Sequence, residues 1–376
     1  MNKKMVFITG IETFFPNRGV ANEEMEDFLG LIGDKSSRVK SIVLRQNGIK
    51  NRFYALDKKQ NITHSNAQLA GEAILCLQKE FNCNDVQLLA CATSTPDQLL
   101  PSHASMVHGY IKGNPMEIFS LAGVCLTSLQ ALKTCYLSIL SNEVKAAICS
   151  ASELPSPTFL SRNYDIEYKS VHENPYMAFE KDFLRFMLSD GASALLLEDS
   201  PKNALNFKIE WIDICSFANE LPTCMFMAAE LKNNGELKGW KEFTPEEQIE
   251  RAVFMGKQDI KALKKYIIKY WVDYIEQCLS KYKLNPSDVN YIIPHVSSMF
   301  FYKLLNEELM QRGIDLGSER WYTNLPEVGN IGSASIFAAL KGLMDTSRLK
   351  NRDKILLLVP ESGRFSFGAA LLTVYK

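Results

Sequence analysis

The sequence predicts an α/β fold in which helices and strands alternate along the whole chain. Three observations lead to this prediction. Apolar residues recur at helical spacing in several segments, and short apolar runs typical of buried strands separate these segments. In addition, four segments of the first part of the chain resemble four segments of the second part in the same order. Such alternation is typical of sheets that are covered by helices.

The first part is expected to begin with a strand and to continue with amphipathic helices between buried strands. Leu126–Leu140 illustrates the helical pattern, because its apolar residues fall three or four positions apart. The expected strands are Met5–Gly10, Val86–Ala92, Ala146–Ala151, Ala192–Leu197 and Phe207–Ile214, and the expected helices are Ala67–Phe81, Ala104–Ile111 and Leu126–Leu140.

The second part is expected to begin with a long helix over Asp259–Lys281. Residues 216–258 before it are polar and irregular, which predicts a connecting loop region on the surface. The elements that follow are strand Val289–Ile293, helix Met299–Gln311, helix Ser333–Met344, strand Ile355–Pro360 and strand Ala369–Tyr375.

An internal duplication relates the two parts. Asp85–Ser94 resembles Asp288–Ser298, Ala131–Lys133 resembles Ala339–Lys341, Lys145–Glu153 resembles Lys354–Ser362, and Gly191–Leu197 resembles Gly368–Val374. The first three pairs are separated by a nearly constant distance and the last by a shorter one, which indicates an insertion at about 154–188. The sequence therefore predicts two similar halves, 1–215 and 216–376.

Composition excludes several classes of protein. Apolar residues make up 46% and charged residues 23% of the 376 residues, and the net charge is −1. These values are ordinary for a globular protein, and a nucleic-acid-binding protein would show a basic excess. No apolar run has the length of about 20 residues that a membrane helix needs, and the N-terminus lacks the apolar core of a signal peptide. We expect a cytoplasmic protein that binds neither nucleic acid nor membranes.

Nine cysteines and five histidines are the unusual counts. No two cysteines form a C-x-x-C pair, and no histidine lies at zinc-ligand spacing from such a pair, so neither a metal site nor an organic cofactor is implied. Without a secretory signal, disulfides are not expected either. Most of the cysteines are best interpreted as small buried hydrophobic residues. A redox-sensing role would require a resolving cysteine, and the spacing identifies none.

Cys125 is the candidate nucleophile because it lies at the start of the predicted helix Leu126–Leu140. The positive end of a helix dipole stabilises a thiolate, which lowers the pKa of the thiol. The alternative is a cysteine that only packs at a helix start.

His295 and Asn330 are the candidate partners of Cys125. His295 comes directly after a predicted strand, where side chains of α/β folds point into clefts. Asn330 stands between glycines before a helix, where it presents an amide donor or merely caps a turn. The duplication places Asn330 just before the second-half partner of the Cys125 helix, and it places His295 on the second-half partner of the Cys91 strand. The three side chains are therefore expected to converge.

These residues resemble the 3-oxoacyl-ACP synthase III branch of the thiolase-fold condensing enzymes. Cys125 follows Gly-Val at a helix start, His295 follows Pro, and Asn330 lies in Gly-Asn-Ile-Gly-Ser-Ala-Ser. Three further segments resemble motifs of that family, namely Asn47–Arg52, Leu188–Ala194 and Arg364–Ala370. The resemblance covers nearly the whole chain and keeps the order of the motifs.

The resemblance implies a thiolase fold with two βαβαβαββ halves in a five-layered αβαβα arrangement. It also implies an acyltransferase in which Cys125 carries an acyl group, while His295 and Asn330 donate hydrogen bonds to a second thioester. Backbone N–H groups at Cys125 and near Arg364 would hold the first carbonyl. The product would be a new carbon–carbon bond by Claisen condensation, and the protein would be a homodimer.

Details of the sequence resemble the subgroup that makes dialkylresorcinols and related cyclohexanediones, including stilbene-type products, in secondary metabolism. There the second substrate is a 3-oxoacyl thioester, and the linear product closes to a ring. Glu153 is the candidate base for ring closure, or alternatively a structural residue. Arg364 stands where the family has glycine and could pair with Glu153 or bind a substrate carboxylate, and Ser297 is expected to contact substrate.

Two other activities fit the same residues. One is a decarboxylating 3-oxoacyl-ACP synthase III that uses malonyl-ACP, and the other is a thiolase-fold acyltransferase that makes esters. A non-catalytic partner subunit is disfavoured because Cys125, His295 and Asn330 are all present. The acyl groups are expected on acyl carrier protein or CoA, and Lys257–Lys283 carries a basic face that could dock an acidic carrier or simply face water.

Overall fold

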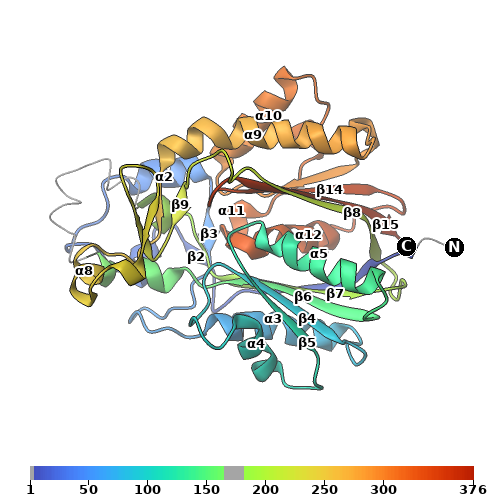
Figure 1. Ribbon diagram of the computed structural model, residues 1–376, viewed down its shortest axis with the longest axis horizontal. Coiled ribbons are helices and arrows are strands. Elements are labelled where there is room, and N and C mark those ends of the chain that lie inside the picture. Colours follow the sequence, from blue (N-terminus) through green and yellow to red (C-terminus); the bar gives the residue numbers. More distant parts are fainter. Residues whose placement is uncertain (1–3, 165–181) are drawn as a thin grey trace.

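The fold consists of five layers, as Figure 1 shows from α10 at the top to α4 at the bottom. The computed structural model describes residues 4–164 and 182–376. Outer helices cover two halves of a β-sheet, and two helices lie between these halves. The α/β class that the sequence predicts is confirmed.

The first half of the sheet has five strands in the order β5-β4-β6-β7-β1. The strand β4 pairs in parallel with β5 and β6, and β7 pairs antiparallel with β6 and β1. The strands are β1 (Phe7–Phe14), β4 (Leu88–Thr93), β5 (Glu117–Ala122), β6 (Ala146–Glu153) and β7 (Gly191–Glu198), with helices α3 (Asn66–Glu80), α4 (His103–Ile111) and α5 (Thr127–Leu140).

The second half has four strands in the order β13-β14-β15-β8. The strand β13 pairs in parallel with β14, and β15 pairs antiparallel with β14 and β8. The strands are β8 (Asn206–Ser216), β13 (Tyr291–Pro294), β14 (Lys354–Glu361) and β15 (Ser366–Tyr375), with helices α9 (Ile260–Lys281), α10 (Met299–Gln311) and α12 (Ser335–Asp345).

The helices α5 and α12 form the central layer. Their apolar faces pack into one buried core with the inner faces of both half-sheets, and this core contains Leu132 of α5 and Leu340 of α12. On the outer faces, α3 and α4 cover the first half, and α9 and α10 cover the second. The two halves join where β1 pairs with β8 at Phe7↔Lys208 and Ile8↔Phe207.

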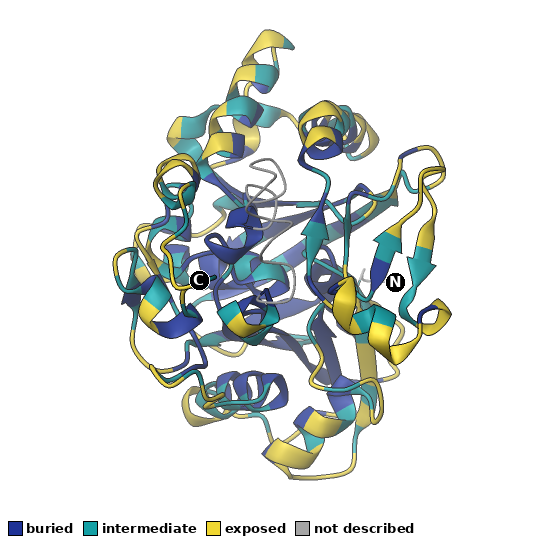
Figure 2. Ribbon diagram, turned by 90° about the vertical axis from the view of Figure 1, so that its left-hand side faces the viewer, coloured by how far each residue is buried: buried dark blue, intermediate teal, exposed yellow. Residues whose placement is uncertain are grey.

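Burial on both faces explains why the strands read as continuous apolar runs. All six residues of β4 are buried. Leu88 faces the inner core, whereas Leu89 faces α3 and α4. Figure 2 shows the same pattern, with strands dark blue in the interior and solvent-facing helix surfaces yellow.

Capping side chains define the starts of the two outer helices α3 and α9. The Ser65 hydroxyl accepts a hydrogen bond from the Gln68 N–H, and the Gln68 side chain accepts one from the Ser65 N–H in return. The Asp259 carboxylate accepts from the Ala262 N–H at 2.9 Å, so α9 begins one residue after the predicted start.

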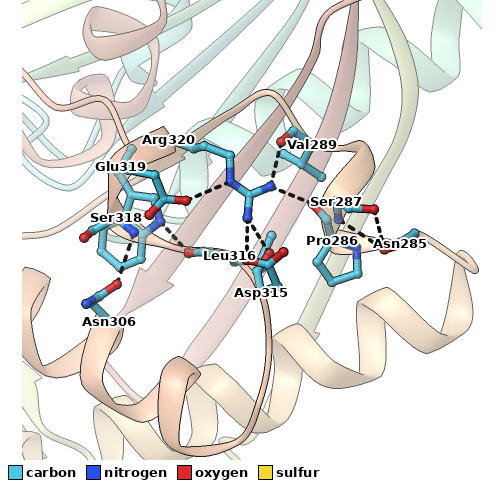
Figure 3. A network of polar contacts seen from close by, with 11 residues as sticks. Asn285, Pro286, Ser287, Val289, Asn306, Asp315, Leu316, Ser318, Glu319 and Arg320 are labelled. Atoms are coloured by element: carbon cyan, nitrogen blue, oxygen red, sulfur yellow. Dashed lines mark hydrogen bonds and ion pairs between the residues drawn. The ribbon is translucent and has the colours of Figure 1, made fainter.

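Arg320 ties the turn before β13 to the chain that follows α10 (Figure 3). Its Nη1 donates to the carbonyl oxygens of Pro286 and Val289, at 2.9 Å each, and its Nη2 donates to Asp315. The Trp321 indole N–H donates to the Leu316 carbonyl at 2.8 Å. These contacts fix the entry into β13, which leads directly to His295.

The predicted surface loop at 216–258 is partly wrong. This segment forms small two-stranded sheets and a helix, and Cys224 and Val253 within it are fully buried. Its apolar residues follow no single period, so no element could be recognised. The elements are β9 (Met225–Phe226), β10 (Ala229–Leu231), β11 (Leu237–Gly239), β12 (Lys257–Gln258) and α8 (Pro245–Glu250).

Several other elements were not predicted, because they are short or exposed. They are β2 (Val20–Ala21), β3 (Asn51–Arg52), α1 (Met25–Leu29), α2 (Lys40–Asn47), α11 (Leu325–Val328) and the edge strand β5. Short 3₁₀ turns occur at Ser156–Phe159, Ser161–Asn163, Trp240–Glu242, Pro286–Asp288, Ser318–Arg320 and Gly332–Ala334.

The duplicated segments occupy matching strands and helices. They lie in β4 and β13, α5 and α12, β6 and β14, and β7 and β15. The predicted insertion at 154–188 falls between β6 and β7, and its residues 165–181 lie outside the described residues. The division into two halves stays a proposal. We would place the boundary before β8 rather than after residue 215, because β8 pairs with β15 along nearly its whole length.

No helix within residues 4–164 and 182–376 combines the length and the apolar character that a membrane crossing requires.

Candidate active site

Cys125 lies in the short loop between β5 and α5, two residues before the first residue of the helix. Its carbonyl accepts a hydrogen bond from the Ser128 hydroxyl at 3.0 Å. Gly123 makes the tight loop possible, since a Cβ there would come within 2.4 Å of the Thr127 hydroxyl oxygen. The loop thus holds the half-buried thiol at the helix start, as the sequence predicts.

The predicted lowering of the Cys125 pKa is wrong. Burial raises the pKa of this thiol, and the negative charges of Glu361 and Glu153 raise it further. The N–H of Cys125 itself acts in the opposite direction but is the smallest of these effects. Burial and the two carboxyl groups therefore raise the thiol pKa by more than the helix start lowers it, and the free thiol is protonated at neutral pH.

His295 continues β13 by one residue, because its N–H donates to the Leu358 carbonyl at 2.8 Å. The side chain is buried, and burial lowers its pKa to about 4. The imidazole is therefore neutral at pH 7, and a neutral imidazole can donate one hydrogen bond and accept another.

Asn330 is buried in the turn that leads into α12, and its amide is oriented by neighbours. The Oδ1 atom accepts from the Gly332 N–H at 3.1 Å and from the Ser335 hydroxyl at 3.4 Å. Because the amide oxygen accepts these two bonds within the turn, the Nδ2 hydrogens remain as donors for the cavity that Asn330 lines.

Glu153 ends β6 and is enclosed by hydrogen-bond donors. Its Oε1 accepts from the Ser333 hydroxyl at 2.6 Å, and its Oε2 accepts from the hydroxyls of Ser94 at 2.6 Å and Thr95 at 2.9 Å. The backbone N–H groups of Ser94 and Ser333 also donate to it. Burial raises the pKa of this carboxyl although these donors oppose the shift.

One cavity of about 320 Å³ is lined by Cys125, Glu153, Asn330 and Ser297, together with an apolar wall, but not by His295. The wall is formed by Phe159, Leu184, Met187, Leu188, Met225, Phe226 and Met227.

A smaller cavity of about 40 Å³ lies against the inner face of α9 and is lined by His295. It shares Cys125, Ser297 and Ser362 with the large cavity. The structure therefore brings the four predicted catalytic residues and Ser297 together around Cys125.

Arg364 is not brought to this site. Its side chain is exposed, its Nε lies 3.4 Å from the Leu221 carbonyl, and it lines neither cavity. The suggested pairing with Glu153 is not formed, since hydroxyl and N–H groups surround that carboxylate. Ser362 is the residue of this turn that lines both cavities together with Cys125.

Sequence reasoning missed the residues that hold the site. Ser94, Thr95 and Ser333 gave no signal because serine and threonine are common in turns. Glu361 did carry a signal: β6 and β14 are matching eight-residue strands that both end in glutamate. An alignment of the duplication shifted by one residue would have paired it with Glu153.

Comparison with known proteins gives a consistent result. Residues 279–374 match the family model of the 3-oxoacyl-[acyl-carrier-protein] synthase III C-terminal region. A beta-ketoacyl-[acyl-carrier-protein] synthase III from Clostridium perfringens is 25% identical over 371 residues, which is 99% of each chain. The corresponding protein from Clostridium novyi is 24% identical and covers 96% of each chain.

Solved structures share the fold. A tetronic acid condensing enzyme superposes with a TM-score of 0.78 at 18% identity, and it covers 98% of this chain and 99% of its own. The 3-oxoacyl-(acyl carrier protein) synthase III of Pseudomonas aeruginosa and a Xanthomonas campestris OleA with bound lauric acid and lauroyl-CoA each superpose at 0.73, with 18% identity and 99% of both chains covered.

The predicted thiolase fold is thereby confirmed. The predicted class of enzyme, an acyltransferase-type condensing enzyme, is the class to which the similar proteins and solved structures belong. The chain is similar to 3-oxoacyl-ACP synthase III proteins over nearly its whole length.

Proposed function

We propose that this protein forms a carbon–carbon bond between two acyl thioesters, with Cys125 as nucleophile and His295 and Asn330 as hydrogen-bond donors. The observation that carries the proposal is the convergence of these three side chains on two cavities that share Cys125. The apolar wall of the larger cavity is suited to an acyl chain.

In the first step, the Cys125 sulfur attacks the carbonyl of an acyl thioester. A new C–S bond to Cys125 forms, the bond to the carrier sulfur breaks, and the thiol proton leaves with the carrier thiol. Neutral His295 is suited to relay this proton, since one of its ring nitrogens is an acceptor. The N–H groups of Cys125 and of the Ser362 turn would stabilise the oxyanion.

In the second step, the second thioester becomes a carbanion, either by loss of CO₂ from malonyl-ACP or by loss of a proton from a 3-oxoacyl thioester. The carbanion attacks the acyl group, a carbon–carbon bond forms, and the bond to the Cys125 sulfur breaks, after which the Cys125 thiolate takes up a proton. His295 and the Nδ2 group of Asn330 stabilise the enolate oxygen of that thioester. Donors preorganised for a developing negative charge each contribute about 3–4 kcal/mol.

Product analysis with purified protein tests this function. Incubation with an acyl thioester and either malonyl-ACP or a 3-oxoacyl thioester should give a carbon–carbon-linked product. The variants Cys125→Ala and Asn330→Ala should lose about 10²-fold or more in rate. The control variant Cys76→Ala, which is remote from the site, should keep the rate of the wild type. An ester as the sole product would contradict the proposal and favour the ester-forming alternative.

We further propose that the second substrate is a 3-oxoacyl thioester and that the product closes to a dialkylresorcinol or cyclohexanedione precursor in secondary metabolism. The specific support is Glu153, a carboxyl of raised pKa that lines the same cavity as Cys125. Such a carboxyl is suited to move a proton during ring closure. Release of CO₂ from malonyl-ACP without ring formation would instead favour a synthase III that supplies fatty acid or polyketide chains.

The variant Glu153→Gln tests the ring-closing role. Acylation of Cys125 should continue in this variant while the ratio of ring to linear product falls, because the amide cannot accept a proton. Glu246→Gln on the exposed face of α8 removes the same charge and is the control. A thermal melt shows how much stability is lost with the hydrogen bonds from Ser94 and Ser333. An unchanged ring yield would refute the role of Glu153.

Three further expectations belong to this proposal. The acyl groups would arrive on acyl carrier protein or CoA, the carrier would dock at the basic face of α9, and two copies would associate through β5. The location in the cytoplasm stays a prediction from the sequence.

A further inference from the structure

Glu361 is a second glutamate close to the nucleophile, and its side chain is half-buried. It is the last residue of β14, where it pairs with Ser366 of β15. Burial raises the pKa of its carboxyl, and the backbone N–H groups of Val124 and Leu126, on either side of Cys125, oppose this shift. It lines neither of the two cavities, so it acts on the site from behind the loop.

The surrounding glycines show how closely this carboxylate is packed. A Cβ on Gly363 would lie 3.1 Å from Oε1 of Glu361, and a Cβ on Gly123 would lie 3.9 Å from Oε2. The carboxylate therefore sits between the turn after β14 and the nucleophile loop.

Glu361 and Glu153 occupy equivalent places in the two halves. Each ends a matching strand, and each carboxylate lies against the loop before the central helix of the opposite half. Glu153 accepts hydrogen bonds from Ser333 in the turn before α12, next to Asn330. Glu361 lies against the loop before α5, which carries Cys125, close to Gly123.

We propose that Glu361 is a positioning residue: its carboxylate lies behind the Cys125 loop, faces the two N–H groups that flank Cys125, and places a negative charge close to the sulfur. Because Glu361 faces the flanking N–H groups and not that of Cys125, the N–H of Cys125 remains available for the oxyanion. The inference deepens the proposed function and rests on it only in taking Cys125 as the nucleophile.

The electrostatics of the site support this role. Among the described residues, Glu361 and Glu153 are the charged groups that act on the Cys125 thiol, and Glu361 is the stronger. The smaller cavity beside Cys125 is lined by neutral His295 and by the apolar residues Leu263, Ile267 and Trp271 of α9. No cation of the described part of the chain acts on the thiol, so the charge of Glu361 is not compensated at the sulfur.

Alkylation of Cys125 by iodoacetamide as a function of pH tests the proposal, with peptide mass spectrometry to follow Cys125 separately from the other cysteines. Only the thiolate reacts, so the rate reports ionisation. Glu361→Gln should move the profile to lower pH by about half a unit or more, which is a threefold or larger gain in rate at neutral pH. Glu246→Gln removes an exposed charge and should leave the profile in place.

Glu361→Asp separates charge from reach. It keeps the charge but shortens the side chain, so the pH profile should stay near that of the wild type while acylation of Cys125 slows. Profiles of all variants that coincide with the wild type, or a wild-type midpoint below about 8.5, the ordinary value for cysteine, would overturn the proposal. A low wild-type midpoint overturns the proposal even if the variants do not fold, and alkylation needs no acyl substrate, so this failure is distinct from failure of the proposed function.

Discussion

His295 shows how burial prepares a residue for its role at the scale of a single side chain. Its pKa of about 4 keeps the ring neutral over the whole physiological range. A hydrogen bond from a neutral imidazole to an enolate needs no prior change of protonation. Burial therefore sets the chemical state that the proposed mechanism requires.

The same burial predicts a dependence of stability on pH. A histidine whose pKa falls from 6.5 to about 4 on folding contributes its full share of stability above pH 6.5, and that share is lost as pH falls toward 4. Between pH 7 and pH 5 the loss from His295 is about 2 kcal/mol.

Urea unfolding of wild type and His295→Asn at pH 7 and pH 5 measures this share. The free energy of unfolding of the variant should change by about 2 kcal/mol less between these two pH values. His103, whose pKa burial also lowers to about 4, retains its own contribution of the same sign in both proteins. An identical pH dependence of the two proteins would contradict the neutral, buried state of His295.

At the scale of the elements, α9 connects the protein surface with the site. Its inner residues Leu263, Ile267 and Trp271 line the smaller cavity, while Lys264, Lys265 and Lys269 are exposed on its other side. Within residues 4–164 and 182–376, these three lysines form no ion pair with an acidic side chain. The helix thus presents uncompensated positive charge close to the site.

Charge reversal on α9 tests whether an acidic carrier protein docks there. Lys264→Glu combined with Lys265→Glu should raise KM for ACP-bound substrate several-fold at low salt and reduce the salt dependence of turnover. Activity with the same acyl group on CoA should change less. The pair Lys79→Glu and Lys145→Glu, exposed at the first half of the sheet, makes the same change in net charge and is the control. Unchanged kinetics of the α9 variant would refute docking.

The sequence allowed most long elements to be predicted, because they have one strong period. Met299–Gln311 forms a helix with the predicted limits, and α9 and β4 differ by one or two residues. Edge strand β5 escaped prediction because four of its six residues are exposed and the apolar run is interrupted. Spacing and resemblance indicated Cys125, His295 and Asn330, whereas the state of each ionisable group depends on neighbours from distant segments. The raised pKa of Cys125 was therefore predicted in the wrong direction.

At the scale of the whole molecule, the two half-sheets bring the candidate catalytic residues Cys125, Glu153 and Asn330 from both parts of the chain to one cavity. The contacts of Glu153 with Ser333 join residues that are 180 positions apart. Such pairings follow from the fold as a whole and are not visible in any local pattern.

The edge of the sheet at β5 supports the proposed homodimer. This strand ends the sheet and exposes Phe119, and α5, which packs against β5, exposes Leu137. An edge strand with apolar neighbours is a ready template for pairing with a second copy.

Light scattering after size exclusion should give twice the chain mass of 42.5 kDa. Phe119→Asp should shift the protein toward monomer, while Met310→Asp, exposed on α10, should not. A monomeric wild type would contradict this interface.

The central claim, that Cys125 carries an acyl group, is tested most directly by intact-protein mass spectrometry after incubation with acyl-CoA and acyl-ACP thioesters. We predict a mass gain equal to one acyl group, located at Cys125 by peptide mapping and abolished by Cys125→Ala. The size of the bound group would also identify the preferred substrate. Product formation without any adduct on Cys125, or an adduct that persists in Cys125→Ala, would contradict the account.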